Sequence, residues 1–129
     1  MKNQIVTFLF NVTPRSDAVD VADMHTLANP LGANPVGRHL QWEHMKANWD
    51  AVVGKMNNPI VIDRFVRLSL CHFTSHDDVA DVDAFFKDKD TSSFNRTLEQ
   101  TKDKSRARAT YKERDAGAIK EWLAANNYL

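Results

Sequence analysis

GRHLQWEHMKANWD, which spans residues 37–50, places two tryptophans one heptad apart, Trp42 and Trp49. Further apolar residues continue at spacings of three, four and seven, and this periodicity predicts a helix with one apolar stripe. The stripe consists of Trp42, Met45, Trp49, Val52, Val53 and Met56. The opposite side of the helix carries Arg38, Glu43, Lys46 and Asp50. A helix that buries one side needs a partner, so this segment predicts half of a helical pair.

Asparagine and proline residues mark both ends of this helix. Asn34 is a favoured capping residue, and Pro35 suits the first helical position, where its missing N–H is not needed. The sequence Asn57-Asn58-Pro59 provides a turn into the next helix. We therefore expect one helix from residue 35 to about residue 56.

Two shorter helices are expected upstream. The apolar residues within 5–9 mark a first helix, which ends before Pro14. A second helix covers residues 20–28 and is stopped by the Asn29-Pro30 step, because proline disfavours helical backbone at the residue before it. Gly32 then completes a turn.

Downstream, residues 60–72 carry apolar side chains on more than one side, which is expected of a helix buried between two others. Ser75 and Asp78 resemble a capping box with the shorter acid and open a fifth helix. The inward positions of that helix are Val79, Val82, Phe85 and Phe86. The acidic residues between 77 and 90 are interpreted as a solvated face, because a calcium loop would need a mid-loop glycine and a closing glutamate.

The last third of the chain is helical but its division is open. A sixth helix runs from Ser92 or Ser93 to about Tyr111, and Asp115 caps a last helix that holds Ile119, Trp122 and Leu123. One bent helix is the alternative. No segment alternates with the period of a strand, so the prediction is an all-α fold, a single domain over residues 1–129, with antiparallel helical pairs stacked as an irregular HEAT-like superhelix.

The composition limits the classes of partner. Seventeen basic and seventeen acidic residues cancel, so neither nucleic acid nor an acidic membrane surface is favoured. No segment approaches the ~20 apolar residues needed to span a bilayer. Cys71 is the only cysteine, and its apolar neighbours indicate a small buried side chain in a reducing compartment, for which we expect the cytoplasm.

The sequence predicts no catalytic residue and no metal site in this chain. His39, Glu43 and His44 imitate a zinc motif, but histidines five positions apart on a helix diverge by about a hundred and forty degrees. Lys104, Arg108 and Lys112 recur every four residues and line one helix face. A solvated face is the favoured interpretation, and attraction of phosphate or a peptide carboxylate is the alternative.

A set of short motifs resembles the C-terminal helical domain of puromycin-sensitive-type zinc metalloaminopeptidases, and several of these stretches of sequence are similar to those of fungal members. In order, these motifs are Gly37-Arg38, Trp42, Asn48-Trp49, Asp63-Arg64-Phe65-Val66, Phe85-Phe86, Arg96-Thr97-Leu98, Arg114-Asp115 and Glu121-Trp122-Leu123. The resemblance implies a catalytic domain with GAMEN and HExxH motifs, followed along the chain by an α-helical superhelix that covers the active-site cavity. Neither motif occurs in these 129 residues, so zinc is a cofactor of the resembled enzyme and none is expected in this chain.

The resemblance also implies basic side chains that face the peptide. Arg38, Arg64 and Arg96 lie in matched motifs, and an arginine fork can bind a carboxylate through two hydrogen bonds. The same arginines could equally join neighbouring helices through Asp50 or Asp63, and this structural role is favoured.

The first functional hypothesis is therefore the C-terminal end of a zinc aminopeptidase, inactive alone, that shapes and closes the peptide cavity. Its partners would be the catalytic portion and the peptide substrate, and the face that meets the rest of the enzyme should be apolar. The alternative is a free-standing helical-repeat module that binds another protein. A homodimer that covers the exposed end is a third possibility.

Overall fold

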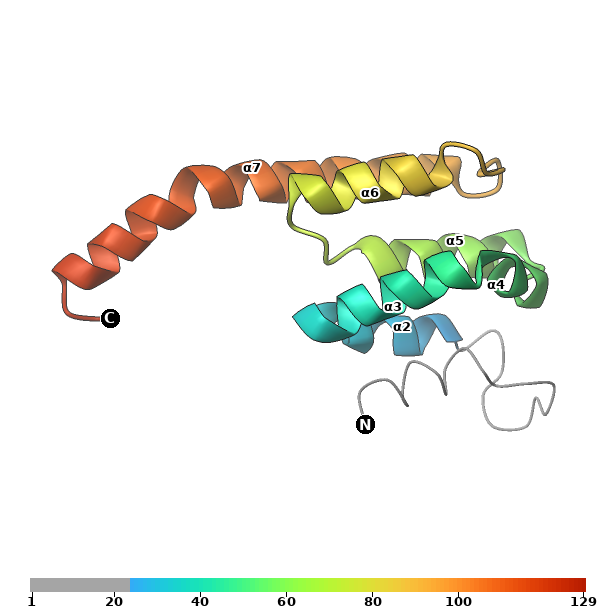
Figure 1. Cartoon of the computed structure of the whole chain (residues 1–129), viewed down its shortest axis with the longest axis horizontal. Helices are drawn as coiled ribbons and strands as arrows, with labels where there is room; N and C mark the ends of the chain where they lie inside the picture. The colour runs from blue at the N-terminus through green and yellow to red at the C-terminus, as the bar shows by residue number, and fades with distance from the viewer. Residues whose placement is uncertain (1–23) are drawn as a thin grey trace.

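The computed structural model describes residues 24–129 and is all-α over that range, as predicted. The helices are α2 (Met24–Ala33), α3 (Pro35–Ala47), α4 (Trp49–Lys55), α5 (Pro59–Leu70), α6 (His76–Phe86) and α7 (Asn95–Ala125) (Figure 1). No strand occurs between residues 24 and 129. The first predicted helix, within residues 5–14, lies outside the described part of the chain.

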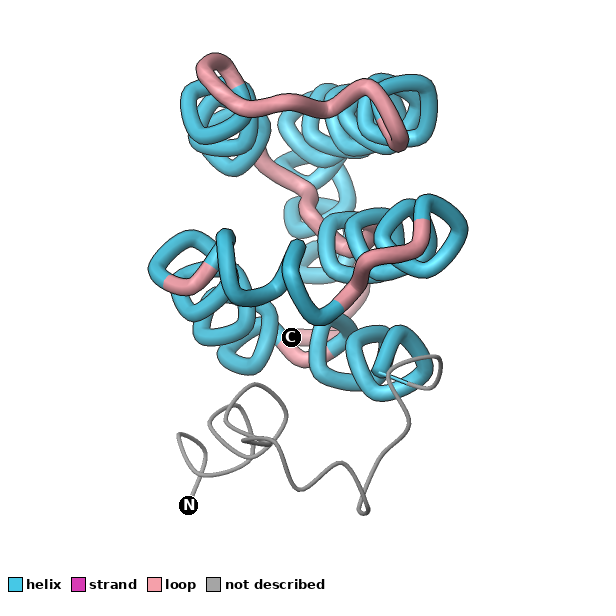
Figure 2. The backbone as a smooth tube through the Cα atoms, turned by 90° about the vertical axis from the view of Figure 1, so that its right-hand side faces the viewer, coloured by secondary structure: helices cyan, strands magenta, loops and turns pink. Residues whose placement is uncertain are grey.

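The helices form two layers of paired elements. Helices α2, α3, α5, α6 and α7 alternate in direction, while α4 follows α3 at the end where the chain turns into α5 (Figures 1 and 2). Helix α6 lies beside α7 above the layer that contains α3, α4 and α5. Helix α2 packs against α3 and α5, while α5 also contacts α7. Helix α5 therefore lies between its neighbours, as its apolar residues predict. The HEAT-like superhelical repeat stays a prediction.

The tryptophan stripe forms the centre of the core. Trp42 is 3% exposed and Trp49 is 8% exposed, whereas Val53, the one stripe residue outside the core, is 38% exposed. The Trp42 ring meets Phe85 edge-on at 5.2 Å between centroids, and Trp49 meets Phe86 at 5.1 Å. These contacts join α3 and α4 to α6. Each edge-to-face pair contributes about 0.5–1.5 kcal/mol of stability beyond the contribution of the apolar area that it buries.

The single helix expected over residues 35–56 is divided at Asn48. This residue has φ −125° and ψ 25°, outside helical values, and its side-chain Nδ2 donates to the His44 carbonyl at 2.9 Å. Asparagine side chains compete with backbone donors for nearby carbonyls, which weakens a helix interior locally. Both Trp42 and Trp49 still contact the ring of Phe86, so the break does not divide the core.

The expected stop of the second helix at Asn29-Pro30 is wrong. Helix α2 continues through Pro30 and ends at Ala33, so Gly32 is helical and not part of a turn. A Cβ atom at Gly32 would approach the Leu68 carbonyl oxygen and His72 Cδ2 at 3.3 Å each. Helix α2 packs closely on α5 at this glycine, and such packing opposes the roughly 3 kcal/mol that proline costs inside a helix.

The two predicted caps, Asn34 and Ser75, are present, and Asn58 in the predicted turn forms a third. The Asn34 side chain accepts hydrogen bonds from the backbone N–H of Val36 (3.0 Å) and Gly37 (3.1 Å). Asn58 accepts from Ile60 at 2.9 Å in the same way. Ser75 Oγ accepts from the Asp78 N–H at 3.1 Å, which is the serine half of the predicted capping box.

The interface between α3 and α5 contains one polar pair. Gln41 Nε2 donates to Ser69 Oγ at 2.9 Å, and both residues are buried. The Gln41 Oε1 atom is buried without a hydrogen-bond partner among the described residues. The other buried polar side chains of the described residues, Thr101, Lys102 and Ser105, all lie on α7.

The last part of the chain is one helix of 31 residues, which Figure 1 shows bending where it extends past the N-terminal end of α6. The helix starts at Asn95, after the buried Phe94, and not at Ser92 or Ser93. Asp115 lies inside the helix, so its predicted capping role is wrong. The sequence could not settle this division because no proline or other strong stop separates residues 95 and 125.

Candidate functional site

A groove of about 380 Å³ lies between α5 and α7. The α5 side provides Arg67, Leu68 and the capping residue Cys71. The α7 side provides five residues that recur at helical spacing on one face, namely Thr97, Gln100, Thr101, Lys104 and Arg108. Three of the eight lining residues are cationic and none is acidic.

The cations of the groove have no carboxylate partner. No Asp or Glu oxygen lies within 4.0 Å of Arg67, Lys104 or Arg108 in the part of the chain that the structure describes. Arg108 instead donates through Nη1 to the carbonyl of Cys71, next to the last residue of α5. That hydrogen bond fixes the Arg108 guanidinium at one end of the groove. Because a carbonyl is neutral, the positive charge stays uncompensated.

The acidic face of α6 contrasts with this groove. Asp81 accepts hydrogen bonds from Trp42 Nε1 (2.6 Å) and Lys46 Nζ (2.8 Å) of α3. Asp83 accepts from Lys102 Nζ at 2.6 Å, and this lysine belongs to α7. The interpretation of this face as merely solvated therefore needs correction, because its acids join α6 to both neighbouring helices.

The hydrogen bonds change the acidity of both carboxyls. Burial raises the pKa of Asp81, but the hydrogen bonds from Lys46 and Trp42 outweigh burial and lower this pKa below its usual value. Burial likewise opposes Lys102 and Arg106 at Asp83, where the two cations lower the carboxyl pKa. Both groups are thus held ionised and act as links between helices.

The three predicted peptide contacts lie on different helices. Arg38 is half-buried on α3, whereas Arg64 on α5 and Arg96 on α7 are exposed. Arg38 Nε donates to the Gly32 carbonyl at 3.0 Å and so joins α3 to α2. None of the three forms an ion pair with Asp50 or Asp63 within the described residues. Their contact with peptide stays a prediction.

Cys71 and His72 follow α5 beside the basic groove. Cys71 is half-buried, less than expected, and its Sγ donates to the Leu68 carbonyl at 3.5 Å. Burial raises the pKa of the Cys71 thiol, although Arg108, Arg67 and Arg38 oppose this effect. The thiol form is therefore favoured, which agrees with a packing role. Burial, then Arg38 and Arg108, lower the pKa of His72.

Residues that could bind a metal do not converge in the described range. Residues 24–129 contain no group of three His, Cys, Asp or Glu side chains placed to hold an ion. His39 is exposed and stacks on Phe73 at 6.3 Å, while burial lowers the pKa of His44.

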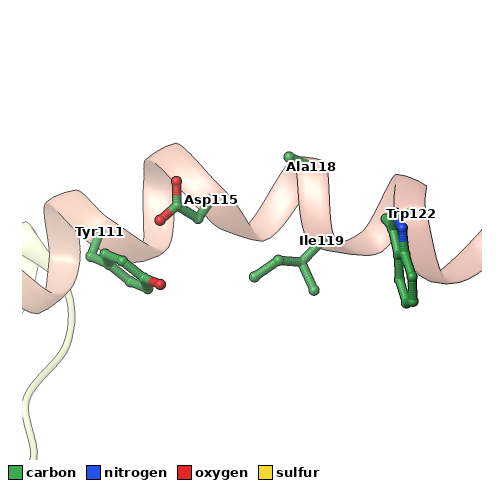
Figure 3. A pocket seen from close by; sticks show the side chains of 5 residues that line it. All are labelled: Tyr111, Asp115, Ala118, Ile119 and Trp122. Atoms are coloured by element: carbon green, nitrogen blue, oxygen red, sulfur yellow. The ribbon is translucent and has the colours of Figure 1, made fainter.

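A second surface feature occupies the C-terminal half of α7. Tyr111, Asp115, Ala118, Ile119 and Trp122 line a shallow pocket of about 360 Å³ (Figure 3). We call Tyr111, Ile119 and Trp122 the α7 stripe; their exposed fractions are 60%, 51% and 58%. No residue of this half contacts another helix closely enough to be buried, since Ala109 is the last buried residue of the chain.

Only part of the basic groove is predictable from the sequence. The four-residue recurrence identified Lys104 and Arg108, but it also included Lys112, which is exposed outside the groove. Arg67 was missed, because the packing of α5 against α7 brings it to Lys104 and Arg108, and no periodicity within one helix reveals such an approach.

No helix among the described residues combines the length and the apolar character needed to cross a bilayer. Although α7 is long, charged residues occur along it.

Comparisons with known proteins identify the relatives of this chain. A family model described as ERAP1-like C-terminal domain matches residues 1–107. Aminopeptidase 2 of Candida albicans is 27% identical over 128 residues, which cover 98% of this chain and 14% of that protein. Aminopeptidase M1-B of Oryza sativa subsp. japonica is 33% identical over 64% of this chain and 9% of its own length. The mitochondrial Aminopeptidase 2 of Saccharomyces cerevisiae is 26% identical over 82% of this chain and 11% of its own length. The chain therefore spans about a seventh, or less, of the aminopeptidases that it matches.

Proposed function

Because this chain belongs to the family of ERAP1-like C-terminal domains, we propose that it forms the C-terminal helical part of a zinc aminopeptidase. In that enzyme it shapes and closes the peptide-binding cavity. The family match over residues 1–107 carries this proposal, and the names of the aligned aminopeptidases support it.

The chain does not supply the catalytic chemistry in this proposal. Its 129 residues contain no HExxH or GAMEN motif, and the described residues offer no set of side chains that fits zinc. Zinc, and the glutamate that serves as base, would belong to the catalytic portion. This chain would contribute walls and peptide contacts, and it would have no peptidase activity alone.

Arg38, Arg64 and Arg96 are the proposed peptide contacts. Arg64 and Arg96 are exposed, with no ion-pair partner among the described residues, so both guanidiniums are available to a carboxylate. Arg38 is partly engaged by the Gly32 carbonyl, which uses one of its five N–H donors. Substitution of Arg64 or Arg96 therefore tests peptide contact with the least risk to the fold.

The test uses a polypeptide that joins this chain to a catalytic portion. We expect it to hydrolyse an aminoacyl fluorogenic amide and a ten-residue peptide, and the 129-residue chain alone to hydrolyse neither. Arg96→Ala should raise KM for the long peptide several-fold and leave the small amide unchanged, because the amide has no distant carboxylate. Lys112→Ala is the matched control, an exposed cation further along the same helix.

Two results would contradict the proposal. Peptidase activity of the 129-residue chain alone would show that its role is not limited to the cavity wall. Equal effects of Arg96→Ala on both substrates would exclude a contact with the far end of the peptide.

The α7 stripe supports the alternative, a free-standing helical module that binds another protein. Three large exposed apolar side chains on one helix are typical of a surface that meets a partner. A second copy of the chain could cover this stripe when no catalytic portion is present. Light scattering with wild-type and Trp122→Ala chains distinguishes a dimer, which we expect to weaken on substitution, from a monomer. Under either proposal, we infer the cytoplasm as the compartment, on the basis of the single unpaired cysteine.

A further inference from the structure

We propose that the groove between α5 and α7 binds a small, multiply charged oxyanion through Arg67, Lys104 and Arg108. The proposal does not rest on the aminopeptidase assignment. It depends on the charges, geometry and volume of the groove itself.

The cations of the groove differ in their partners from other cations in the structure. Lys46, Lys102 and Arg106 each pair with at least one carboxylate, at distances of 2.5–3.0 Å. Arg67 and Lys104 have no such partner in the described residues, and Arg108 contacts only a carbonyl. Cations gathered on one groove repel each other, and an anion with two or more charges removes that repulsion.

The geometry places donors on both walls. Arg67 comes from α5, one turn before Cys71, while Lys104 and Arg108 lie one turn apart on the facing side of α7. The Cys71 carbonyl holds Arg108 through Nη1, so its remaining N–H groups are held in place without a further ordering step. Two guanidinium forks and an ammonium match the oxygens of a phosphate or carboxylate group.

The remaining lining suits a polar ligand of limited size. Thr97 and Gln100 add a hydroxyl and an amide on the same face of α7. The volume of about 380 Å³ exceeds the ~30 Å³ share of one water many times and falls at the lower end of ligand sites. A diphosphate or a small polycarboxylate fits these limits.

The test is calorimetric titration of the 129-residue chain with two probes, inorganic pyrophosphate and citrate, in a buffer without divalent cations. We expect saturable binding of at least one probe at a single site, weakening as salt is added. The tighter probe identifies phosphate or carboxylate as the preferred group, and either ranking supports the site.

Substitutions locate the binding. Lys104→Ala and Arg67→Ala should each weaken the tighter probe about tenfold or more. Lys112→Ala removes the same charge two turns further along the same helix face, outside the groove, and should change binding less than twofold. Lys104 and Arg67 are exposed and make no ion pair in the described residues, so thermal unfolding of these variants should stay near that of the wild type. If Arg67→Ala unfolds, Lys104→Gln takes its place.

The proposal fails if neither probe binds saturably at millimolar concentration. It also fails if Lys112→Ala weakens binding as much as Lys104→Ala, because attraction would then depend on total charge and not on this groove.

Discussion

The two halves of α7 differ in environment although they form one continuous helix. Residues 95–109 place Leu98, Thr101, Lys102, Ser105 and Ala109 in the core at spacings of three and four. Residues 110–125 contain no buried position, and Tyr111, Ile119 and Trp122 among them are exposed. The first half is stabilised by tertiary packing and by the Lys102–Asp83 ion pair. The second half contacts another helix through Thr110 and Glu113, which lie 3.3 Å and 3.5 Å from His76 Nε2 at the start of α6, and its other pair, Arg114–Asp115, is local.

This difference shows that helix formation and packing are separate requirements. A solvent-exposed helix of about fifteen residues is marginal in water, so the second half depends on its attachment to the first. A surface that covers the α7 stripe would stabilise this half by burying its exposed apolar side chains. In the proposed enzyme, the rest of the protein would supply that surface.

The largest expected effect comes from removing one tryptophan in each region. Trp42→Ala deletes a side chain that is 3% exposed, that touches three phenylalanines and that donates to Asp81. We expect a loss of about 3–5 kcal/mol in the free energy of unfolding. Trp122→Ala should lower it by less than about 0.5 kcal/mol. Urea denaturation of both variants measures the contrast, and similar losses would show that the second half is coupled to the core.

Glycine substitutions should also distinguish the packed region from the exposed half of α7, with changes in stability of intermediate size. A Cβ atom at Gly37 would lie 2.6 Å from the Leu31 carbonyl oxygen, so Gly37→Ala should cost about 1–3 kcal/mol. Gly117 has open space around it, and alanine there should raise helicity by circular dichroism without moving the global unfolding midpoint.

Gly54→Ala is the control for this pair. Its Cβ also meets nothing within 4 Å, but Gly54 lies on α4 in the packed part of the molecule. Alanine should therefore raise global stability, by up to about 1 kcal/mol. A rise of the same size for Gly117→Ala would contradict the independence of the second half.

Acid should lower the stability of the packed region more than that of the exposed one. This effect should be smaller than those of the tryptophan and glycine substitutions. The pKa values of Asp81 and Asp83 are lowered in the folded state, so the stability from their pairs is complete above the ordinary aspartate pKa. It is lost as the pH falls below about 4 and passes the lowered folded values. Because both carboxyls are partly exposed, each pair contributes about 1 kcal/mol or less.

Asp81→Asn should flatten this acid dependence, as measured by denaturation at a series of pH values. Asp115→Asn removes a carboxyl whose pKa is lowered by Arg114 in the exposed half. This variant should leave the global profile unchanged, and a flattened profile would show that the exposed pair stabilises the core.

The fold was predictable where local chemistry and periodicity agree. Residues close in sequence predict the tryptophan stripe and the central position of α5. They also predict where α3, α5 and α6 begin, after Asn34, Asn58 and Ser75. The continuation of α2 through Pro30 was not predictable, because the tertiary packing around it, such as that of Gly32 on a helix about forty positions away, is not visible in the local sequence. The break at Asn48 was missed for another reason, since the apolar spacing continues across it.

The candidate site was less accessible to sequence reasoning than the fold. One wall of the basic groove follows from the spacing of Lys104 and Arg108, but Arg67 joins them only through the packing of α5 on α7. The acids of α6 show the opposite case. Their spacing indicates a solvated face, and only the positions of Lys46 and Lys102 reveal that Asp81 and Asp83 bind neighbouring helices.

The Gln41–Ser69 pair has a consequence for how α3 finds its place on α5. A slide of either helix by one residue would separate the amide from the hydroxyl and leave both without partners in hydrocarbon surroundings, at about 1–3 kcal/mol for each group. Apolar contacts alone discriminate weakly between such neighbouring alignments, because one aliphatic side chain can replace another. The pair therefore penalises wrong registers more than it strengthens the right one, and Gln41 still has an unused acceptor in the correct alignment.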